Sequence, residues 1–306
     1  MDKNENPQSG RNYQLPLGSA AGGLSFSATV VINLLVSIIG TVIITVGSLK
    51  GTDAAKYISV LVSPIAIAVT LALALKVVKQ PARAILPVKT HPKYYLIGVL
   101  LIFGLLFSLL YANEYLIKLF ELMGYKRRPP FTPDVSGWKV VPALLAIAVI
   151  PAVMEEILFR GILLNNTEEG AGSVRAILLS GFCFALYHGS VEQTIYQFIC
   201  GCLFAFLAVR SRSVAPTVVI HFLNNAVIIV LMACGLIDES GMLIMPKTAE
   251  IIVSVLSAVS LIGAVVWLIL DKKELKICET GGVRQFFIFA AVGIGATVII
   301  WITGLF

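Results

Sequence analysis

The chain has 306 residues, of which 58% are hydrophobic and only 13% are charged, and its mean hydropathy is +0.93. Soluble globular domains carry about 25% charged residues, so this composition excludes a soluble domain and predicts a protein that lives in a bilayer. The net charge of +6 comes from loops between apolar stretches, where it can face anionic lipid, and no basic domain outside the membrane is left to bind nucleic acid.

Nine apolar stretches follow one another along the chain, each close to the ~20 residues with which a helix crosses a hydrocarbon core. They lie at residues 24–47, 57–78, 94–112, 138–165, 174–190, 194–210, 216–235, 249–270 and 284–305. The fifth and sixth are short and could form a tight, partly re-entrant hairpin instead of two full crossings. We therefore expect an all-α fold, a polytopic transmembrane helical bundle with eight or nine membrane segments.

The basic residues of the loops predict an orientation. If all nine stretches cross the membrane, the loops on the side of the N-terminus carry 14 Lys and Arg residues, including Lys3 and Arg11 in a polar N-terminal tail, against 8 on the other side. Loops rich in Lys and Arg remain in the cytoplasm. We expect an integral multi-pass membrane protein with a cytoplasmic N-terminus.

Three ionisable residues interrupt the fourth stretch, namely Glu155, Glu156 and Arg160. Ionisable groups at membrane depth cost roughly 3 kcal/mol or more each, so they are functional candidates by default. On a helix, Glu156 and Arg160 stand four residues apart with the acid first, which favours an ion pair, and an arginine that cannot lose its proton needs such a partner. Glu155 points about 100° away and stays available as a general base. The alternative is that all three only hold helices together.

Two of the three histidines lie in other apolar stretches. His188 follows Phe184 by four residues, so an aromatic ring and an imidazole share one helix face. His221 and Asn225 are also four residues apart and could both donate to the oxyanion of a tetrahedral intermediate. Asn224 is nearly as well placed by geometry alone, although we expect its substitution to cost little. A polar patch that packs helices is the alternative for each pair taken singly, but together these residues predict one polar pocket.

The positions of the aspartates and histidines in the sequence exclude other common catalytic arrangements. All five aspartates lie in a tail or loop, which leaves no acid for an intramembrane Ser-His-Asp triad or aspartyl dyad: Asp2, Asp53, Asp134, Asp238 and Asp271. The two-histidine zinc motif is absent as well, since the segment from His188 to Glu192 has the wrong spacing. Zinc held by Glu155, His188 and His221 is a valid ligand set, but we favour no metal and no cofactor because no two of these ligands share a helix turn.

The ordered motifs resemble a known family. Glu155-Glu156-x-x-x-Arg160, Phe184-x-x-x-His188 and His221-x-x-x-Asn225 in a polytopic chain are similar to the CPBP family, the CAAX-protease and bacteriocin-processing membrane proteins related to the type II CAAX prenyl endopeptidase. The resemblance covers about residues 138–230. It divides the chain into an N-terminal tail with accessory helices (1–137), a CAAX-protease-like catalytic core of four helices (138–235) and C-terminal transmembrane helices (236–306).

The resemblance implies the roles of individual residues. It implies an endopeptidase in which Glu155 activates a water with help from His188, while His221 and Asn225 stabilise the oxyanion. Glu156, Arg160 and Phe184 would support the site. The resemblance leaves metal dependence open, because family members are often described as metalloproteases.

The resemblance also limits the substrate to a class. It implies a C-terminal or membrane-proximal segment of a peptide or protein, cut in a prokaryotic cell membrane. Two other functions compete with proteolysis: a membrane immunity or binding protein that keeps the fold without cutting, and a small transporter. A transporter is disfavoured because the chain shows no internal duplication.

Overall fold

The computed structural model describes residues 18–76, 81–127, 132–237, 243–271, 273–278 and 281–305. The N-terminal tail with Lys3 and Arg11 lies outside these described residues. The α-helices are α1 (Gly18–Val46), α2 (Asp53–Lys76), α3 (Ala82–Ile85), α4 (Lys93–Ser108), α5 (Leu110–Leu122), α6 (Val140–Ala143), α7 (Ile150–Glu156), α8 (Asn165–Ala171), α9 (Ser173–Tyr187), α10 (Thr194–Ser211), α11 (Ala215–Ala233), α12 (Lys247–Leu270) and α13 (Gly282–Leu305). A 3₁₀ turn, η2 (Gly137–Lys139), and two π-helices, η3 (Leu144–Val149) and η4 (Ile157–Leu164), complete the helical part.

Eight helical stretches of the described chain are long and apolar enough to cross a membrane. One of them runs without a break through Gly137–Ala171 and joins η2, α6, η3, α7, η4 and α8. A ninth apolar helix, α9, has only 15 residues. The prediction of an all-α polytopic bundle with eight or nine segments is confirmed.

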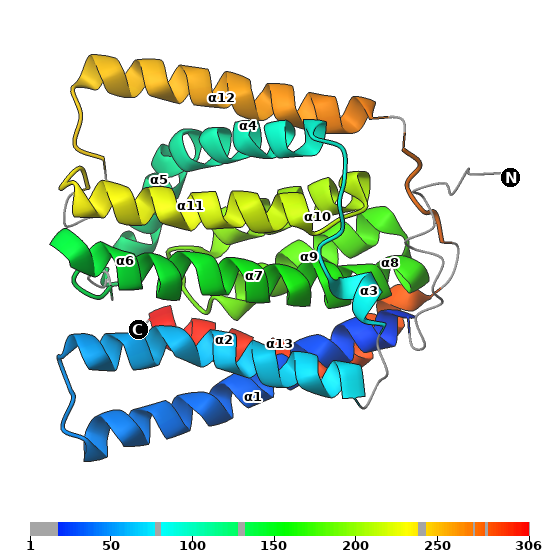
Figure 1. Ribbon diagram of the computed structural model, residues 1–306, viewed down its shortest axis with the longest axis horizontal. Coiled ribbons are helices and arrows are strands. Elements are labelled where there is room, and N and C mark those ends of the chain that lie inside the picture. Colours follow the sequence, from blue (N-terminus) through cyan, green and yellow to red (C-terminus); the bar gives the residue numbers. More distant parts are fainter. Residues whose placement is uncertain are drawn as a thin grey trace, which may run out of the picture.

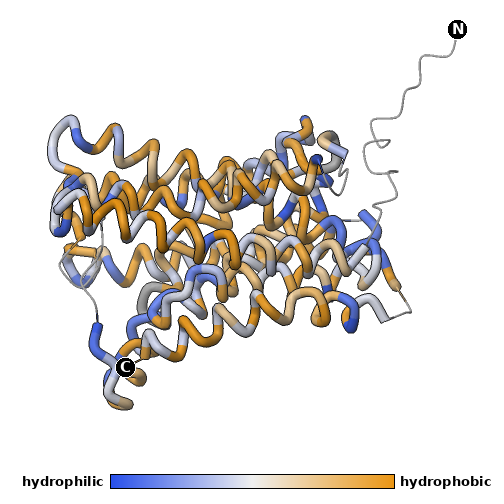
Figure 2. The backbone as a smooth tube through the Cα atoms, turned by 90° about the horizontal axis from the view of Figure 1, so that it is seen from below, coloured by the Kyte–Doolittle hydropathy of each residue, from blue (hydrophilic) through white to orange (hydrophobic). Residues whose placement is uncertain are grey.

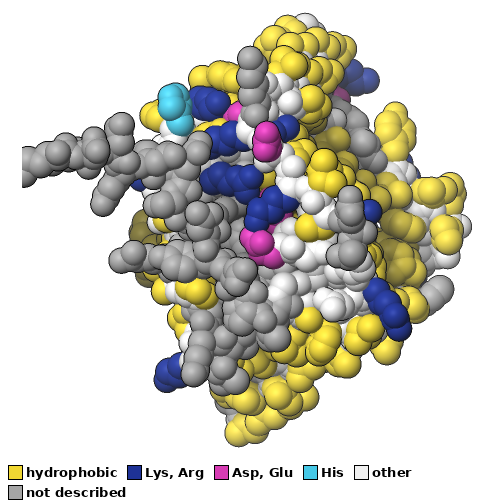
Figure 3. Space-filling model, turned by 90° about the vertical axis from the view of Figure 1, so that its right-hand side faces the viewer, with side chains coloured by type: hydrophobic (Ala, Val, Ile, Leu, Met, Phe, Trp, Pro, Cys, Tyr) yellow, Lys and Arg dark blue, Asp and Glu magenta, His cyan; other side chains and the backbone are white. Residues whose placement is uncertain are grey.

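The helices alternate in direction between two ends of the bundle (Figure 1). We call "end A" the end where α1 begins and where the connections α8–α9, α10–α11 and α12–α13 lie. "End B" is the opposite end, with the connections α1–α2, α9–α10 and α11–α12. Figure 2 shows apolar residues along the helices and polar ones gathered near both ends. Figure 3 looks onto end A, where Lys and Arg side chains stand among a few acidic ones.

Glycines set the closest approach between helices. A Cβ atom on Gly201 of α10 would lie 2.8 Å from the Cα atom of Gly181 on α9. Such contacts between small residues let membrane helices pack backbone to backbone. Close packing is important in a bilayer because the hydrophobic effect does not drive helices together there. The contact between α9 and α10 brings the backbone of α10 close to the charged residues of the central helix.

The central helix is irregular on both sides of α7. Pro151 lies in the first turn of α7 and has no N–H group. In a regular α-helix, residue 151 would donate to the carbonyl of Ile147, so this proline leaves that carbonyl without its α-helical partner. The π-helices η3 and η4 flank this short α-helix, and π-helical turns occur mostly at functional sites.

Candidate functional site

A cavity of about 390 Å³ lies inside the bundle, between its middle and end B. We call it the reaction cavity. Its lining comes from α1, α2, η3, α7, α9, α10 and α11 and includes Glu155, His188, His221, Asn224 and Asn225. The predicted site residues of three separate stretches therefore meet at one place.

Glu156 and Arg160 form the predicted ion pair. Arg160 Nη1 lies 2.8 Å from Glu156 Oε1, and both side chains are completely buried. Arg160 Nη2 also donates to the carbonyl of Gly201 at 3.1 Å. The guanidinium carbon lies 4.5 Å from the ring centre of Phe184 and 5.4 Å from that of Phe204. A carboxylate, a carbonyl and aromatic faces thus replace the water that this cation loses.

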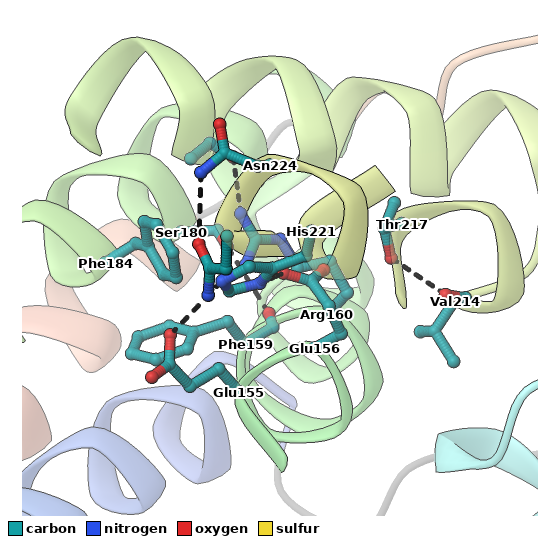
Figure 4. A network of polar contacts seen from close by, with 12 residues as sticks. Glu155, Glu156, Phe159, Arg160, Ser180, Phe184, Val214, Thr217, His221 and Asn224 are labelled. Atoms are coloured by element: carbon teal, nitrogen blue, oxygen red, sulfur yellow. Dashed lines mark hydrogen bonds and ion pairs between the residues drawn. The ribbon is translucent and has the colours of Figure 1, made fainter. Parts of the chain in front are cut away.

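The same Glu156 oxygen orients His221. His221 Nδ1 lies 2.9 Å from Glu156 Oε1, and because a carboxylate can only accept, Nδ1 carries the proton in this contact. The other ring nitrogen, Nε2, then lies 3.9 Å from Glu155 Oε2. Figure 4 shows this network, with His221 between the two glutamates and Arg160 behind Glu156.

Glu155 differs from its neighbour in having no cation of its own. Its side chain is 7% exposed and lines the reaction cavity. Among the described atoms, its Oε2 has no hydrogen-bond partner. A buried carboxylate that lines a cavity and is not bound by a neighbouring Lys or Arg is suited to take a proton from water.

His188 stands at the end of α9 with a fixed tautomer. Its Nδ1 lies 2.8 Å from the carbonyl of Phe184, so Nδ1 donates and the neutral ring keeps an accepting Nε2. Its ring packs against Phe184 at 4.7 Å between centres, as the shared helix face predicted. The 15 residues of α9 rise about 22 Å, which is less than the ~30 Å of a hydrocarbon core.

The two asparagines of α11 form a connected chain of hydrogen bonds. The Tyr196 hydroxyl donates to Asn224 Oδ1 at 2.7 Å, Asn224 Nδ2 donates to Asn225 Oδ1 at 3.1 Å, and Asn225 Nδ2 donates to the carbonyl of Ile147 at 3.1 Å. That carbonyl is the one released by Pro151. Sequence reasoning treated Asn224 and Asn225 as alternatives, whereas the structure links them. It missed Tyr196 entirely. For Asn225, the available signal was Pro151, which stands four residues after Ile147 and cannot donate to the carbonyl of Ile147.

The helices α1 and α2 complete the wall of the cavity, although their sequences showed no motif. The Tyr187 hydroxyl lies 3.0 Å from Ser63 Oγ and 3.5 Å from Asn33 Oδ1. Tyr187 also packs edge-on against Phe159, which joins this wall to the central helix. Polar residues inside the apolar stretches of α1 and α2 were the available signal.

The positions of Glu155, His188 and His221 show whether these residues could bind a zinc ion together. The donors free to bind one would be the Nε2 atoms of His188 and His221 and a Glu155 oxygen, since both Nδ1 atoms are engaged. Two ligands of a tetrahedral zinc at about 2.05 Å stand about 3.3 Å apart, compared with the 3.9 Å between His221 Nε2 and Glu155 Oε2. Among the described residues, no three His, Cys, Asp or Glu side chains are gathered closely enough to hold a metal ion. The arrangement does not fit a zinc site as it stands.

Comparisons with known proteins match the segment of the chain that holds the candidate site. Residues 137–227 match the model of the family described as type II CAAX prenyl endopeptidase Rce1-like, and this segment contains every predicted site residue. The chain is also 27% identical over 187 residues to the membrane-embedded CAAX protease MroQ of Staphylococcus aureus (strain USA300), across 58% of this chain and 74% of that protein. No solved structure matches the chain significantly. The segment that holds the candidate site is therefore similar to CAAX-protease-like membrane proteins of the CPBP family.

Proposed function

We propose that this protein is an intramembrane endopeptidase in which Glu155 activates a water molecule for attack on a peptide bond. The observation that carries the proposal is the contrast between adjacent glutamates. Arg160 and His221 both bind Oε1 of Glu156, which does not line the reaction cavity, whereas Glu155 lines it and makes no ion pair with Lys or Arg among the described residues. Similarity of residues 137–227 to a CAAX prenyl endopeptidase family, and of the chain to a membrane-embedded CAAX protease, supports the same reaction.

The proposed first step is the attack of water. Glu155 and the Nε2 atom of His188 both offer lone pairs, so they can hold one water by its two protons and turn an oxygen lone pair toward the substrate carbonyl. The water oxygen bonds to the carbonyl carbon while its proton passes to Glu155. No metal is needed for this step, and zinc bound by Glu155, His188 and His221 is the competing mechanism.

The proposed second step is collapse of the tetrahedral intermediate. Asn225 uses one Nδ2 proton on the Ile147 carbonyl and has a second one for the oxyanion. His221 can donate from Nε2 when its ring carries both protons, since Nδ1 is held by Glu156. The carbon–nitrogen bond then breaks, and the protonated Glu155 returns its proton to the leaving amine.

We propose a C-terminal or membrane-proximal peptide segment as the substrate, and bacteriocin-type processing as one setting for it. The proposed orientation places end A in the cytoplasm, because its loops carry more Lys and Arg. Reporter fusions test this orientation: a phosphatase joined after α13 should be active outside the cell, and one placed within residues 273–278 should be inactive.

Cleavage of a degenerate decapeptide library by the purified protein tests the function. Mass spectrometry should find products with wild type and none with Glu155→Gln, which keeps the volume of the side chain but cannot accept the proton. Glu250→Gln, the same change on α12 away from the cavity, should cleave normally. Equal cleavage by Glu155→Gln and wild type would contradict the general-base role, and no cleavage by either would favour an immunity or binding protein.

A further inference from the structure

A second cavity of about 260 Å³ lies between α1 and α2. Its lining shares Asn33, Ser59 and Ser63 with the reaction cavity, so the two adjoin each other. Figure 1 shows α1 and α2 separating toward end B, where their connection lies. We call this second cavity the α1–α2 cleft. It adjoins the cavity that Glu155 lines.

Hydroxyl groups stand on both walls of the cleft, beside the apolar side chains of Ile44, Ile58 and Val62. On α1, Ser37 and Thr41 line the cleft, whereas Ile38 and Val42 are 61% and 54% exposed on the outer face. On α2, Ser59 faces the cleft from the other side. Lipid tails need no such polar wall, so the cleft fits an occupant with hydrogen-bonding groups.

The hydroxyls of the cleft offer acceptors. Ser37 donates its proton to the carbonyl of Asn33 at 2.7 Å, Thr41 donates to that of Ser37 at 2.8 Å, and Ser59 donates to that of Ala55 at 2.9 Å. A hydroxyl has one proton and two lone pairs, so each oxygen can still accept. The cleft therefore suits an occupant with N–H or O–H donors.

The spacing of these acceptors matches an extended peptide. Ser37 and Thr41 are one helical step of four residues apart, a rise of about 6 Å. In an extended chain, the N–H groups on one edge recur every second residue, about 6.7 Å apart. A peptide at membrane depth must satisfy these donors, because unpaired backbone groups in hydrocarbon are costly.

We propose that the α1–α2 cleft binds the substrate as an extended peptide, with alternate backbone N–H groups donating to Ser37 and Thr41 on α1. This rests on the proposed proteolytic function and adds where the substrate chain lies on one side of the cleaved bond. The cleft then contributes to substrate affinity, and the residues around Glu155 perform the chemistry.

An N-methyl scan of a library peptide that wild type cleaves tests this binding mode. Methylation of successive backbone nitrogens should raise KM about tenfold at alternate positions and less than threefold between them, with kcat nearly unchanged. In the Ser37→Ala variant, the penalty at one of the sensitive positions should largely disappear. Ser37→Leu, which fills the cleft, should raise KM about tenfold, and Val42→Leu on the lipid face should not. A scan without alternation, or one unaffected by Ser37→Ala, would overturn the proposal.

A labelling experiment separates this proposal from the proposed function if no library peptide is cleaved. Ser37→Cys is prepared with Cys202, Cys234 and Cys278 replaced by Ala, since these are the cysteines that are not fully buried. A water-soluble maleimide should label Cys at position 37, and the decapeptide library should slow labelling at least fivefold. If the library does not slow labelling, the cleft admits water but binds no peptide, and the proposal is overturned. If Cys at position 37 does not react with the maleimide at all, lipid fills the cleft, and the proposal is overturned as well.

Discussion

Glu156→Gln should destabilise the protein strongly, whereas Glu155→Gln should not. Glu156 is the only carboxylate in hydrogen-bond contact with the fully buried Arg160 among the described residues. Breaking a buried ion pair by removing one charge costs about 3–5 kcal/mol. Glutamine still accepts from Arg160 and from His221, so we expect the lower end, about 3 kcal/mol. At about 2–4 °C per kcal/mol for a chain of this size, the melting temperature should fall by roughly 6–12 °C.

Thermal melting of the detergent-purified variants measures this difference. Glu155→Gln should melt within about 2 °C of wild type, because Glu155 has no cation to leave unpaired. The double variant Glu156→Gln/Arg160→Met should recover most of the loss, since methionine places an apolar chain among the aromatic rings that contact Arg160. A wild-type melting temperature for Glu156→Gln, or no recovery in the double variant, would refute the assignment of Glu156 as the partner of a buried charge.

Three further predictions follow from the site and from end A. Asn225→Ala should lower kcat about a hundredfold with KM nearly unchanged, and Tyr196→Phe should lower kcat about tenfold at an unchanged melting temperature; equal losses that track the amount of folded protein would return both residues to packing roles. Purified protein should hold well under one zinc per chain by elemental analysis and keep its activity after chelation, and activity lost on chelation and restored by zinc would contradict the metal-free mechanism. Burial raises the pKa of Asp271, but hydrogen bonds from Lys93 and Tyr94 outweigh it and hold the pKa below its ordinary value. Its stabilising effect is therefore complete above about pH 4 and is lost as the pH falls through the lowered pKa, so Asp271→Asn should lower the melting temperature at pH 7 and make a steadily smaller difference as the pH falls below about 4.

The motifs were predictable because each lies on a single helix. The four-residue spacing from Glu156 to Arg160, and from Phe184 to His188, survives in the structure as direct contact. Helical periodicity carries this information without any knowledge of neighbouring helices. Composition alone was sufficient for the fold class, since the apolar stretches have the length that a bilayer demands.

Contacts between different helices could not be predicted from the spacing of residues along the sequence. The hydrogen bond from Tyr196 to Asn224 joins α10 to α11, and its existence depends on how closely these helices pack. The approach of α9 and α10 at Gly181 and Gly201 has the same origin. The hydrogen bond from Asn225 to the Ile147 carbonyl was partly predictable. Pro151 indicates that this carbonyl lacks its α-helical donor, but the sequence does not indicate which side chain will donate to it.

The distribution of roles over the chain follows from the charges at its centre. A buried Arg160 cannot lose its proton, so it holds Glu156, and this leaves Glu155 as the carboxylate for which we propose the role of accepting a proton. These residues lie in the segment that matches the family, which ends at residue 227. The wall that Asn33 and Ser63 build against Tyr187 lies outside that segment. If the chemistry is common to the family while α1 and α2 bind the substrate, relatives with the same motifs can cut different peptides, and the residues that decide between substrates are to be sought in the first two helices.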